Sequence, residues 1–304
     1  MEPVQIVFLG TASAAPTPER NLSSIAIRYL GEWILFDCPE GGQRQMLTSG
    51  VSYMKISKIF LTHLHLDHVL GLPGLLATMQ MHQRTDPLTI FCPVGWKPKT
   101  SALIRLAPKT GFEIKLEEIT GGLVVSNDAY SISAVALKHE VTCFGLIFQQ
   151  APKPGTFLRE KAVKLKIPEG PLWRKLQSGQ SIKLKGKTIS PKMVMDATKK
   201  KNGVKIAYIV DTAPAKSYHK AIAGSDILVH EATFGNEFAV RAKETLHSTA
   251  MDAAKAAASA KCKQLILTHL SSRHKTGDDL VREAQTIFKN TTVAKDLDSL
   301  TVKG

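Results

Sequence analysis

The chain has 304 residues, of which 43% are apolar and 22% charged, and its formal net charge is +14. These proportions supply enough apolar side chains for a large core and exclude a fully disordered protein. No run approaches the ~18 apolar residues that a membrane helix needs, and the opening residues lack the pattern of a secretory signal. The four cysteines (Cys38, Cys92, Cys143 and Cys262) have no paired spacing, so a disulfide framework is not expected. We therefore expect a soluble, reduced, cytoplasmic protein with no membrane partner.

Most of the excess positive charge lies in one segment. Residues 151–205 carry 15 Lys and Arg against three acidic residues, whereas residues 1–150 carry 12 of each kind. Charge of one sign at this density is typical of a surface that binds a polyanion, and it favours a nucleic acid as the partner. A solvated lysine-rich surface without a partner is the alternative that charge alone leaves open.

Predicted strands and helices alternate through the first half of the chain. Apolar runs that end in polar residues or glycine predict strands at 4–9, 24–29, 33–37, 56–62, 88–92, 112–119, 130–137 and 143–148. Helical patterning covers residues 41–49 and 70–83, and Gly31-Glu32 predicts a hairpin turn between the second and third strands. This order favours an α/β fold with a mixed sheet and helices outside it.

The second half of the chain begins with a change of composition. Residues 151–155 predict a linker, and a basic stretch punctuated by proline and glycine follows. Core-like strands return at 204–210, 227–230 and 264–268, with helices at 248–262 and 278–289. Ser248 is the expected N-cap of the first of these helices. We therefore predict one domain over residues 1–304, interrupted by an inserted basic arm at 151–195.

A dense set of metal-ligating side chains follows the strand at 56–62. His63, His65, Asp67 and His68 place three imidazoles and a carboxylate within six residues. These borderline nitrogen and hard oxygen ligands suit zinc or a similar divalent ion, although a solvated His-rich turn would have the same composition. The stretch therefore predicts a metal site at the end of this strand.

Three further candidate ligands stand at the ends of other predicted strands. His139, Asp211 and His269 each follow an apolar run, as His63 does. An open sheet gathers the carboxyl ends of its strands along one edge. Any one of these residues alone would more often be structural, but together with the first cluster they predict a larger metal centre.

The HxHxDH pattern of His63, His65, Asp67 and His68 resembles the signature of the metallo-β-lactamase fold superfamily. Other stretches resemble motifs of its ribonuclease Z family, the tRNA 3′-processing endonucleases, in their short form. These stretches are His230-Glu231-Ala232-Thr233 with His247 after it, Asp211-Thr212, Gly10-Thr11 with a loop that ends in Arg20-Asn21, and Gly170-Pro171 in the basic segment. The resemblance covers nearly the whole chain. In one departure, Val210 stands where many members have glycine.

The resemblance implies a metallo-β-lactamase-like αβ/βα four-layer sandwich with two metals at its edge and an inserted basic arm. By analogy, the first metal is held by His63, His65 and His139, the second by Asp67, His68 and His269, and Asp211 bridges the two. We expect Zn²⁺, two ions per chain, with Mn²⁺ or Fe²⁺ as alternatives, because His/Asp sites accept each of these ions.

The resemblance also implies catalytic and substrate-binding roles. Asp67 can orient the attacking water or accept its proton, and His247 with Glu231 can protonate the departing 3′-oxygen. Without the resemblance, His247 would be interpreted as a surface histidine at the start of a helix, and Glu231 as an ordinary carboxylate behind the metal ligands. The expected substrate-binding residues are Gly170, Pro171, Arg20, Asn21 and Arg273, the last being as compatible with a plain surface position.

The resulting hypothesis is a zinc-dependent endoribonuclease that removes the 3′ trailer from precursor tRNA by two-metal phosphodiester hydrolysis. The cut would leave a 3′-hydroxyl on the tRNA and a 5′-phosphate on the trailer. A homodimer is expected by analogy, with the arm of one subunit serving the other. Two alternatives remain at this point: a general metal-dependent phosphodiesterase of the same fold, and a non-catalytic RNA-binding protein with structural metals.

Overall fold

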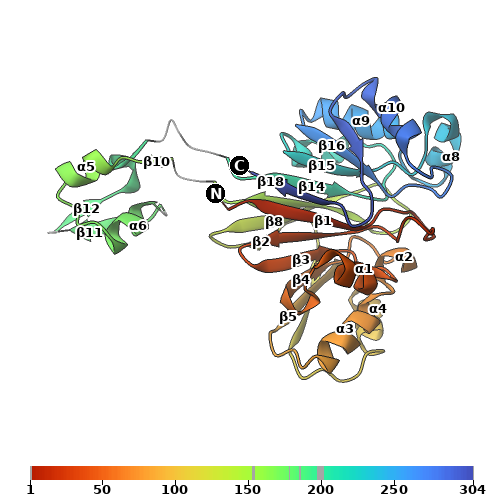
Figure 1. The fold of residues 1–304 in the computed structure, drawn as a ribbon, viewed down its shortest axis with the longest axis horizontal. Coiled ribbons are helices and arrows are strands. Elements are labelled where there is room, and N and C mark those ends of the chain that lie inside the picture. Colours follow the sequence, from red (N-terminus) through yellow and green to blue (C-terminus); the bar gives the residue numbers. More distant parts are fainter. Residues whose placement is uncertain (1, 153–154, 178, 185, 197–201, 304) are drawn as a thin grey trace.

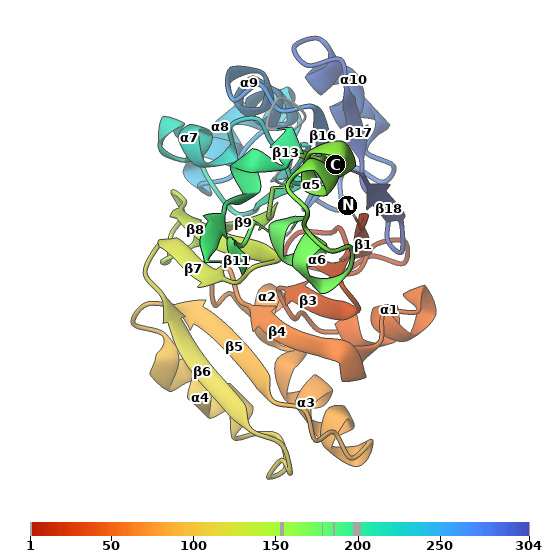
Figure 2. The same cartoon turned by 90° about the vertical axis from the view of Figure 1, so that its left-hand side faces the viewer.

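The computed structural model describes residues 2–152, 155–177, 179–184, 186–196 and 202–303. Two seven-stranded sheets pack face to face, and helices cover the outer side of each (Figure 1, Figure 2). A small arm, residues 155–196, projects from one end of this sandwich. In the described part of the chain, no helix is long and apolar enough to span a membrane.

The first sheet comes from the N-terminal half of the chain and the last strand. Its strands, in spatial order, are β18 (Ser299–Val302), β1 (Val4–Gly10), β2 (Ser24–Tyr29), β3 (Glu32–Phe36), β4 (Ile56–Phe60), β5 (Leu88–Pro93) and β6 (Ile114–Ile119). The helices in this half are α1 (Gly42–Ser49), α2 (Leu66–Val69), α3 (Leu72–Met81) and α4 (Lys97–Ile104). Pairing is antiparallel from β18 to β3 and parallel from β3 to β6. The predicted hairpin between β2 and β3 is confirmed, but its turn is Leu30-Gly31 rather than Gly31-Glu32, because Glu32 already pairs with Tyr29. Leu30 and Gly31 both have positive φ, as a two-residue hairpin turn requires.

The second sheet comes from the C-terminal half of the chain. Its strands, in spatial order, are β17 (Thr291–Val293), β16 (Gln264–Thr268), β15 (Ile227–Glu231), β14 (Lys205–Ile209), β9 (Phe144–Gln150), β8 (Tyr130–Ala136) and β7 (Gly122–Ser126). The helices in this half are α7 (His219–Ile222), α8 (Ala239–Glu244), α9 (Ala250–Ser259) and α10 (Asp278–Gln285). Strands β14 to β17 are parallel, and β7, β8, β9 and β14 pair antiparallel. The predicted mixed sheet therefore becomes two sheets.

Three apolar clusters separate the layers of the sandwich. Between the sheets, Phe36 of the first packs against Tyr208 of the second, with ring centroids 5.9 Å apart. A second cluster joins Leu72 and Leu76 of α3 to the outer face of the first sheet, and a third joins the alanine face of α9 to the second sheet. Each fully buried large side chain contributes about 1.5–3 kcal/mol to folding. The predicted αβ/βα four-layer arrangement is confirmed.

The arm folds around a small core of its own. Its elements are β10 (Thr156–Phe157), α5 (Arg159–Lys164), α6 (Pro171–Gln177), β11 (Ile182–Leu184), β12 (Lys187–Ile189) and β13 (Met195–Asp196). The core residues are Ala162, Ile167, Trp173, Leu176, Ile182, Ile189 and Val194. Nε1 of Trp173 donates to the carbonyl of Ile167 at 3.0 Å. Lys153 and Pro154 of the predicted linker lie outside the described residues.

The expected N-cap of helix α9 is wrong by one residue. Thr249, not Ser248, caps the helix: its hydroxyl accepts from the amide of Asp252, whose carboxylate in turn accepts from the Thr249 amide. The acidic residue three positions after Thr249 completes this capping box, and Ser248 has no such partner. The Ser248 hydroxyl instead donates to the carbonyl of Thr212 at 2.6 Å.

Several short elements were not predicted from the sequence, among them helix α4 and strand β7. Helix α4 begins Lys97-Pro98, and its short span shows little apolar periodicity. Strand β7 is an exposed edge strand, so its pattern lacks a buried face. In both elements the apolar periodicity from which a helix or a strand is predicted is weak.

Candidate metal centre

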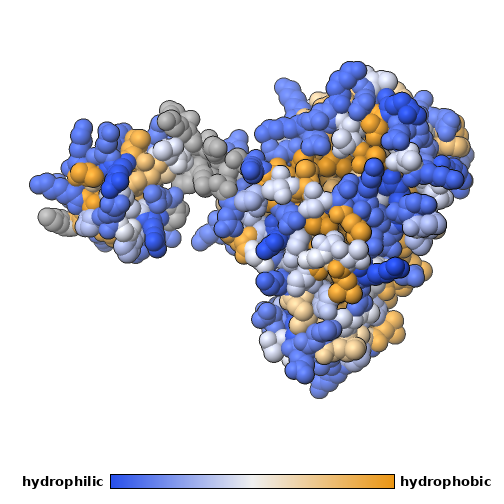
Figure 3. Space-filling view, in the orientation of Figure 1, coloured by the Kyte–Doolittle hydropathy of each residue, from blue (hydrophilic) through white to orange (hydrophobic). Residues whose placement is uncertain are grey.

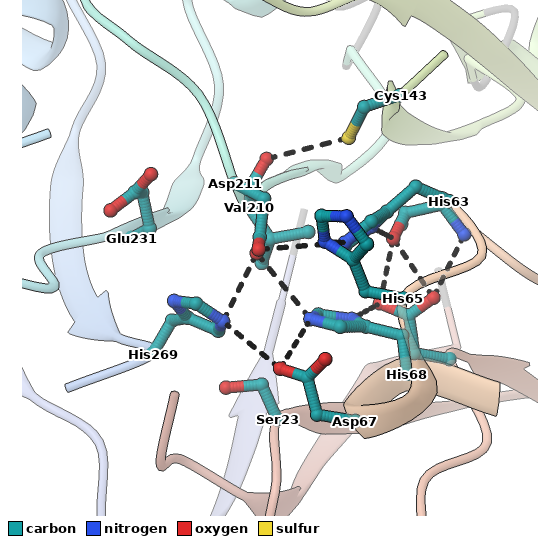
Figure 4. Close-up of polar contacts among 12 residues, drawn as sticks. Ser23, His63, His65, Asp67, His68, Cys143, Val210, Asp211, Glu231 and His269 are labelled. Atoms are coloured by element: carbon teal, nitrogen blue, oxygen red, sulfur yellow. Dashed lines mark hydrogen bonds and ion pairs between the residues drawn. The ribbon is translucent and has the colours of Figure 1, made fainter. Parts of the chain in front are cut away.

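The seven candidate ligands meet where strands of both sheets end. They follow β4 (His63, His65), lie on α2 (Asp67, His68), stand between β8 and β9 (His139), and follow β14 (Asp211) and β16 (His269). Figure 4 labels six of them: His63, His65, Asp67, His68, Asp211 and His269. The parallel strands β14, β15 and β16 have their carboxyl ends at this edge, as open sheets of this kind require.

One group of ligand atoms contains His63, His65, His139 and Asp211, all within 4.8 Å of one another. Oδ2 of Asp211 lies 3.5 Å from Nε2 of His63 and 3.8 Å from Nε2 of His139. Nδ1 of His65 lies 3.1 Å from Nε2 of His63. Ligands of a tetrahedral zinc ion are about 3.3 Å apart, since each bond is about 2 Å long. The spacing of this group therefore suits one cation.

A second group contains Asp67, His68 and His269. Oδ1 of Asp211, the other oxygen of that carboxylate, lies 3.4 Å from Nε2 of His68 and 3.1 Å from Nε2 of His269. Oδ2 of Asp67 lies 3.5 Å from Nε2 of His68 and 4.0 Å from Nε2 of His269. Asp211 thus presents one oxygen to each group, the geometry of a bridging carboxylate.

Unpaired buried atoms test whether these residues fit metal ions. Among the described residues, five buried side-chain nitrogen or oxygen atoms have no hydrogen-bond partner, and three of them belong to the second group: Nε2 of His68, Oδ1 of Asp211 and Nε2 of His269. A buried polar atom without a partner costs about 1–3 kcal/mol, so orphaned atoms of this kind are rare in native proteins. These three atoms face one another, so a cation that all three ligate would satisfy them together.

Asp37 supports the second group, and the sequence analysis missed it. Its carboxylate accepts from Nδ1 of His68 at 2.9 Å and from the amide of Thr62 at 2.8 Å. A carboxylate behind a metal-binding histidine orients the ring and leaves the other nitrogen free. Burial lowers the pKa of His68, but Asp211 and Asp37 outweigh it and raise the pKa to about 10. The negative potential that favours a proton on His68 equally favours a metal cation. The available signal was position, because Asp37 directly follows β3.

Three residues of the centre also have a strained backbone. Asp37, Asp211 and His269 have φ of 61°, 42° and 57°, in the left-handed region that non-glycine residues rarely adopt. Val210 is fully buried in the core between the sheets, and the left-handed conformation falls on Asp211 instead. Glycine is therefore not required at position 210 for this turn.

Glu231 and His247 form a pair beside the second group. Glu231 is fully buried at the end of β15, and its carboxylate accepts from the Thr212 amide at 2.7 Å, the Thr233 hydroxyl at 2.6 Å and Nδ1 of His247 at 3.0 Å. Burial raises the pKa of Glu231, but the adjacent His247 outweighs it and lowers the pKa to about 2. Burial lowers the pKa of His247, but Glu231 outweighs it and raises the pKa to about 9. His247 can therefore carry a proton at neutral pH. It also lies near enough to Asp211 and His269 to join them around a cation.

A cavity of about 610 Å³ opens over the centre. Arg273 lies on its rim, as does Arg241 of α8, which the sequence analysis did not single out. Nη1 of Arg273 donates to the Ser271 hydroxyl at 3.1 Å. Both arginines are exposed and could meet a phosphate, and only the tertiary structure brings Arg241 to this cavity.

The other predicted substrate-binding residues lie elsewhere. Arg20 is 6% exposed, and its guanidinium points inward to four protein acceptors. This replaces the predicted substrate contact of Arg20 by a structural one. The side chain of Asn21 is half-buried, and its amide donates to the Glu40 carbonyl at 3.1 Å. Gly170 and Pro171 stand at the start of α6 in the arm, away from the centre (Figure 1).

Comparison with known proteins shows the family. A family model described as Anti-Pycsar protein Apyc1 matches residues 4–99. The Ribonuclease Z of Methanothermobacter thermautotrophicus is 40% identical over 301 residues, covering 99% of this chain and 97% of that protein. The Ribonuclease Z of Nitrosopumilus maritimus is 38% identical over 301 residues, covering 99% of this chain and 100% of that protein. The chain belongs to the ribonuclease Z family.

Solved structures agree with this membership. Human tRNase Z, short form, superposes with a TM-score of 0.71 at 26% identity, covering 99% of this chain and 100% of that one. The metallo-β-lactamase fold protein YhfI from Bacillus subtilis superposes equally well, with a TM-score of 0.71 at 17% identity, a likeness of fold alone. The predicted metallo-β-lactamase fold is confirmed, and so is the predicted class, a metal-dependent enzyme of the ribonuclease Z type.

Proposed function

We propose that this chain is a zinc-dependent endoribonuclease that removes the 3′ trailer from precursor tRNA. One observation carries the proposal: in a member of the ribonuclease Z family, Asp211 faces two groups of His and Asp ligands, and three ligand atoms at the second group have no hydrogen-bond partner. The cut would leave a 3′-hydroxyl on the tRNA and a 5′-phosphate on the trailer.

The proposed ligands divide as the two groups do. The first ion would be held by His63, His65 and His139, the second by Asp67, His68 and His269, and Asp211 would belong to both. Two divalent cations supply charge neutralisation for the phosphodiester and lower the pKa of water toward neutrality. Zinc is the proposed metal because the set contains five imidazoles, and Mn²⁺ or Fe²⁺ are the alternatives.

Protein side chains would carry the proton steps. Oδ2 of Asp67 is held by the Ala14 amide at 3.1 Å, which leaves Oδ1 available to orient the attacking water or to accept its proton. His247, kept protonated by Glu231, faces the cavity and would donate its proton to the 3′-oxygen as the phosphorus–oxygen bond breaks. General acids of this kind contribute about 10²- to 10⁴-fold to rate.

The arm favours precursor tRNA over a small phosphodiester as the substrate. Among its described residues, the exposed basic side chains are Arg159, Lys161, Lys164, Lys166, Arg174, Lys175, Lys183, Lys187 and Lys192. On the face shown in Figure 3, hydrophilic side chains surround a few apolar ones on the arm. Contacts of lysine and arginine with phosphates supply affinity and position but no sequence specificity. We propose that the arm binds the body of the tRNA through such contacts.

The position of the arm supports a homodimer. Strand β9 follows the loop of His139 and ends at Gln150, where the arm leaves the sandwich; β14 returns from the arm and ends next to Asp211. At about 3.3 Å per residue, a seven-residue strand puts the base of the arm roughly 20 Å from the metal edge. The arm extends further in the opposite direction (Figure 1). It would therefore serve the centre of a partner subunit rather than its own.

One experiment separates the proposal from its alternatives. Purified protein is incubated with a precursor tRNA that carries a 3′ trailer, with and without a chelator, and the product ends are mapped. We expect one metal-dependent cut at the base of the trailer. Hydrolysis of small phosphodiesters without that cut would indicate a general phosphodiesterase, and tRNA binding without any cut would indicate a non-catalytic RNA-binding protein.

A further inference from the structure

The loop at residues 11–21 connects two ligands of the second group, Asp67 from the first half of the chain and His269 from the second half. The amide of Ala14 donates to Oδ2 of Asp67 at 3.1 Å, which ties the loop to the first half. The Leu270 amide donates to the Thr11 carbonyl at 2.9 Å, and the Ser13 amide donates to the Leu270 carbonyl at 3.0 Å. Leu270 directly follows His269, so these two bonds tie the same loop to the second half. The loop is thus a link between Asp67 and His269.

The Arg20 guanidinium fixes this loop through four hydrogen bonds. Nη1 donates to the Thr11 hydroxyl and to the Ala294 carbonyl, both at 2.7 Å. Nη2 donates to the Thr276 carbonyl at 2.9 Å, and Nε to the Lys275 carbonyl at 3.3 Å. A rigid planar fork that meets four acceptors in three segments cannot be reproduced by the single ammonium of lysine.

Asp296 completes the anchor on the other side of Thr11. Its Oδ1 accepts from the Thr11 hydroxyl at 2.7 Å, and its Oδ2 accepts from the Asn21 amide at 2.6 Å and from Nε2 of Gln45 at 2.7 Å. The Thr11 hydroxyl therefore accepts from the Arg20 guanidinium and donates to the Asp296 carboxylate. Thr11 is fully buried, and its bond with Arg20 is buried as well, whereas its bond with Asp296 is partly buried. A hydrogen bond is electrostatically stronger in such surroundings than in water.

We propose that Arg20, Thr11 and Asp296 are positioning residues that set the spacing of Asp67 and His269 for the second metal. They touch neither substrate nor ligand side chain, and they act through the backbone of the loop. The inference rests on the proposed function, since it concerns one of the two proposed metal sites. Loss of a residue behind the ligands of a metal site weakens metal binding or activity by about 10- to 100-fold.

A second arginine provides a matched control. Arg84 is 4% exposed and donates to the carbonyls of Met54, Ile56, Asp86 and Pro87. It thus has the burial and the four acceptors of Arg20. Ile56 and Pro87 stand at the amino ends of β4 and β5, whereas the metal centre lies at the carboxyl ends. A lysine at position 84 should destabilise the fold without reaching the centre.

The test compares two pairs of variants in the full chain. Arg20→Lys is paired with Arg84→Lys, and Thr11→Val, which loses the hydroxyl, is paired with Thr11→Ser, which keeps it. Zinc bound per chain is measured at equilibrium against a graded competing chelator, together with the unfolding temperature. Precursor cleavage supplies kcat and KM separately. We expect Arg20→Lys and Thr11→Val to weaken only the second zinc, by about 10- to 100-fold, and to lower kcat with KM unchanged. Thr11→Ser and Arg84→Lys should keep both zinc ions with wild-type affinity.

Three outcomes would overturn the inference. Retention of both zinc ions at wild-type affinity in Arg20→Lys and Thr11→Val would remove its basis. Equal zinc loss in Arg20→Lys and Arg84→Lys would reduce Arg20 to a general stabiliser of the fold. A wild-type chain that binds fewer than two zinc ions would overturn the proposed function, and this inference with it.

Discussion

The metal edge and the arm are built in opposite ways. At the edge, Asp37, Glu231 and Asp211 are almost completely buried, and each ligand depends on partners from distant parts of the chain. In the arm, the basic side chains are exposed around a small core, and Arg159 pairs with Glu169 at the surface, at 3.1 Å. Catalysis requires fixed geometry, whereas affinity for a polyanion requires only a high density of charge. The two regions should therefore fail separately when each is altered.

The largest effect is expected at the shared ligand. Asp211→Ala should abolish precursor cleavage and reduce the binding of both metals, because each oxygen of this carboxylate faces one ligand group. Elemental analysis and a cleavage assay measure the two losses. His82→Ala is the control, since His82 is exposed and makes an edge-to-face contact with Tyr53. An Asp211 variant that retains two metals per chain would contradict the bridging assignment.

Removal of the proposed proton donor should be nearly as severe but should spare the metals. His247→Ala is expected to slow cleavage by about 10²- to 10⁴-fold with metal content near two per chain. Single-turnover rates and elemental analysis on the same preparation test both parts. If the variant loses one metal, His247 is a ligand with Asp211 and His269, and its role as the acid is wrong.

Replacement of the arm tests the other side of the comparison. A short Gly/Ser linker in place of residues 155–196 should leave hydrolysis of a small chromogenic phosphodiester largely intact, because no proposed ligand lies in the arm. Cleavage of precursor tRNA should be largely lost because binding is weaker. The slope of the logarithm of the binding constant against the logarithm of the salt concentration should become shallower by several units if the arm contacts several phosphates.

The control for the arm is the wild-type protein over the same salt series. Unchanged binding, cleavage and salt dependence without the arm would mean that the basic segment is a solvated surface only. Parallel loss of small-substrate hydrolysis would mean that the arm supports the centre, and the two regions would then not be independent.

The smallest expected effect is a shift in pH dependence. Since Glu231 raises the pKa of His247 to about 9, the protonated form persists through neutral pH, and activity should fall as the pH rises through about 9. Glu231→Gln removes the carboxylate and leaves burial, which lowers the pKa. The alkaline limb of the kcat profile should therefore move toward neutral pH. A limb that stays near pH 9 in the variant would assign it to another group.

The sequence by itself determined two kinds of feature: those set by residues close together in the chain, and those, such as net charge, that are counted over a segment. The spacing of His63, His65, Asp67 and His68 is set by one strand end and one helical turn, so the motif predicts its own geometry. Most strands were predicted because alternating or continuous apolar runs report burial directly. The charge of the arm is additive, so a count of Lys and Arg identified the segment without any structure.

Only the tertiary structure decided how distant segments meet. Asp37 carries no motif and became visible only through its bond to His68, 31 residues away. From the sequence, Arg20 was expected to contact the substrate. In the structure its guanidinium instead donates to the buried carbonyls of Lys275, Thr276 and Ala294. Hydrogen bonds over more than 250 residues of sequence depend on the packing of both sheets, which no local pattern encodes. The ligands could be predicted because each follows a recognisable strand. The buried hydrogen bonds that hold them at their distances could not, because they join segments that meet only when both sheets pack.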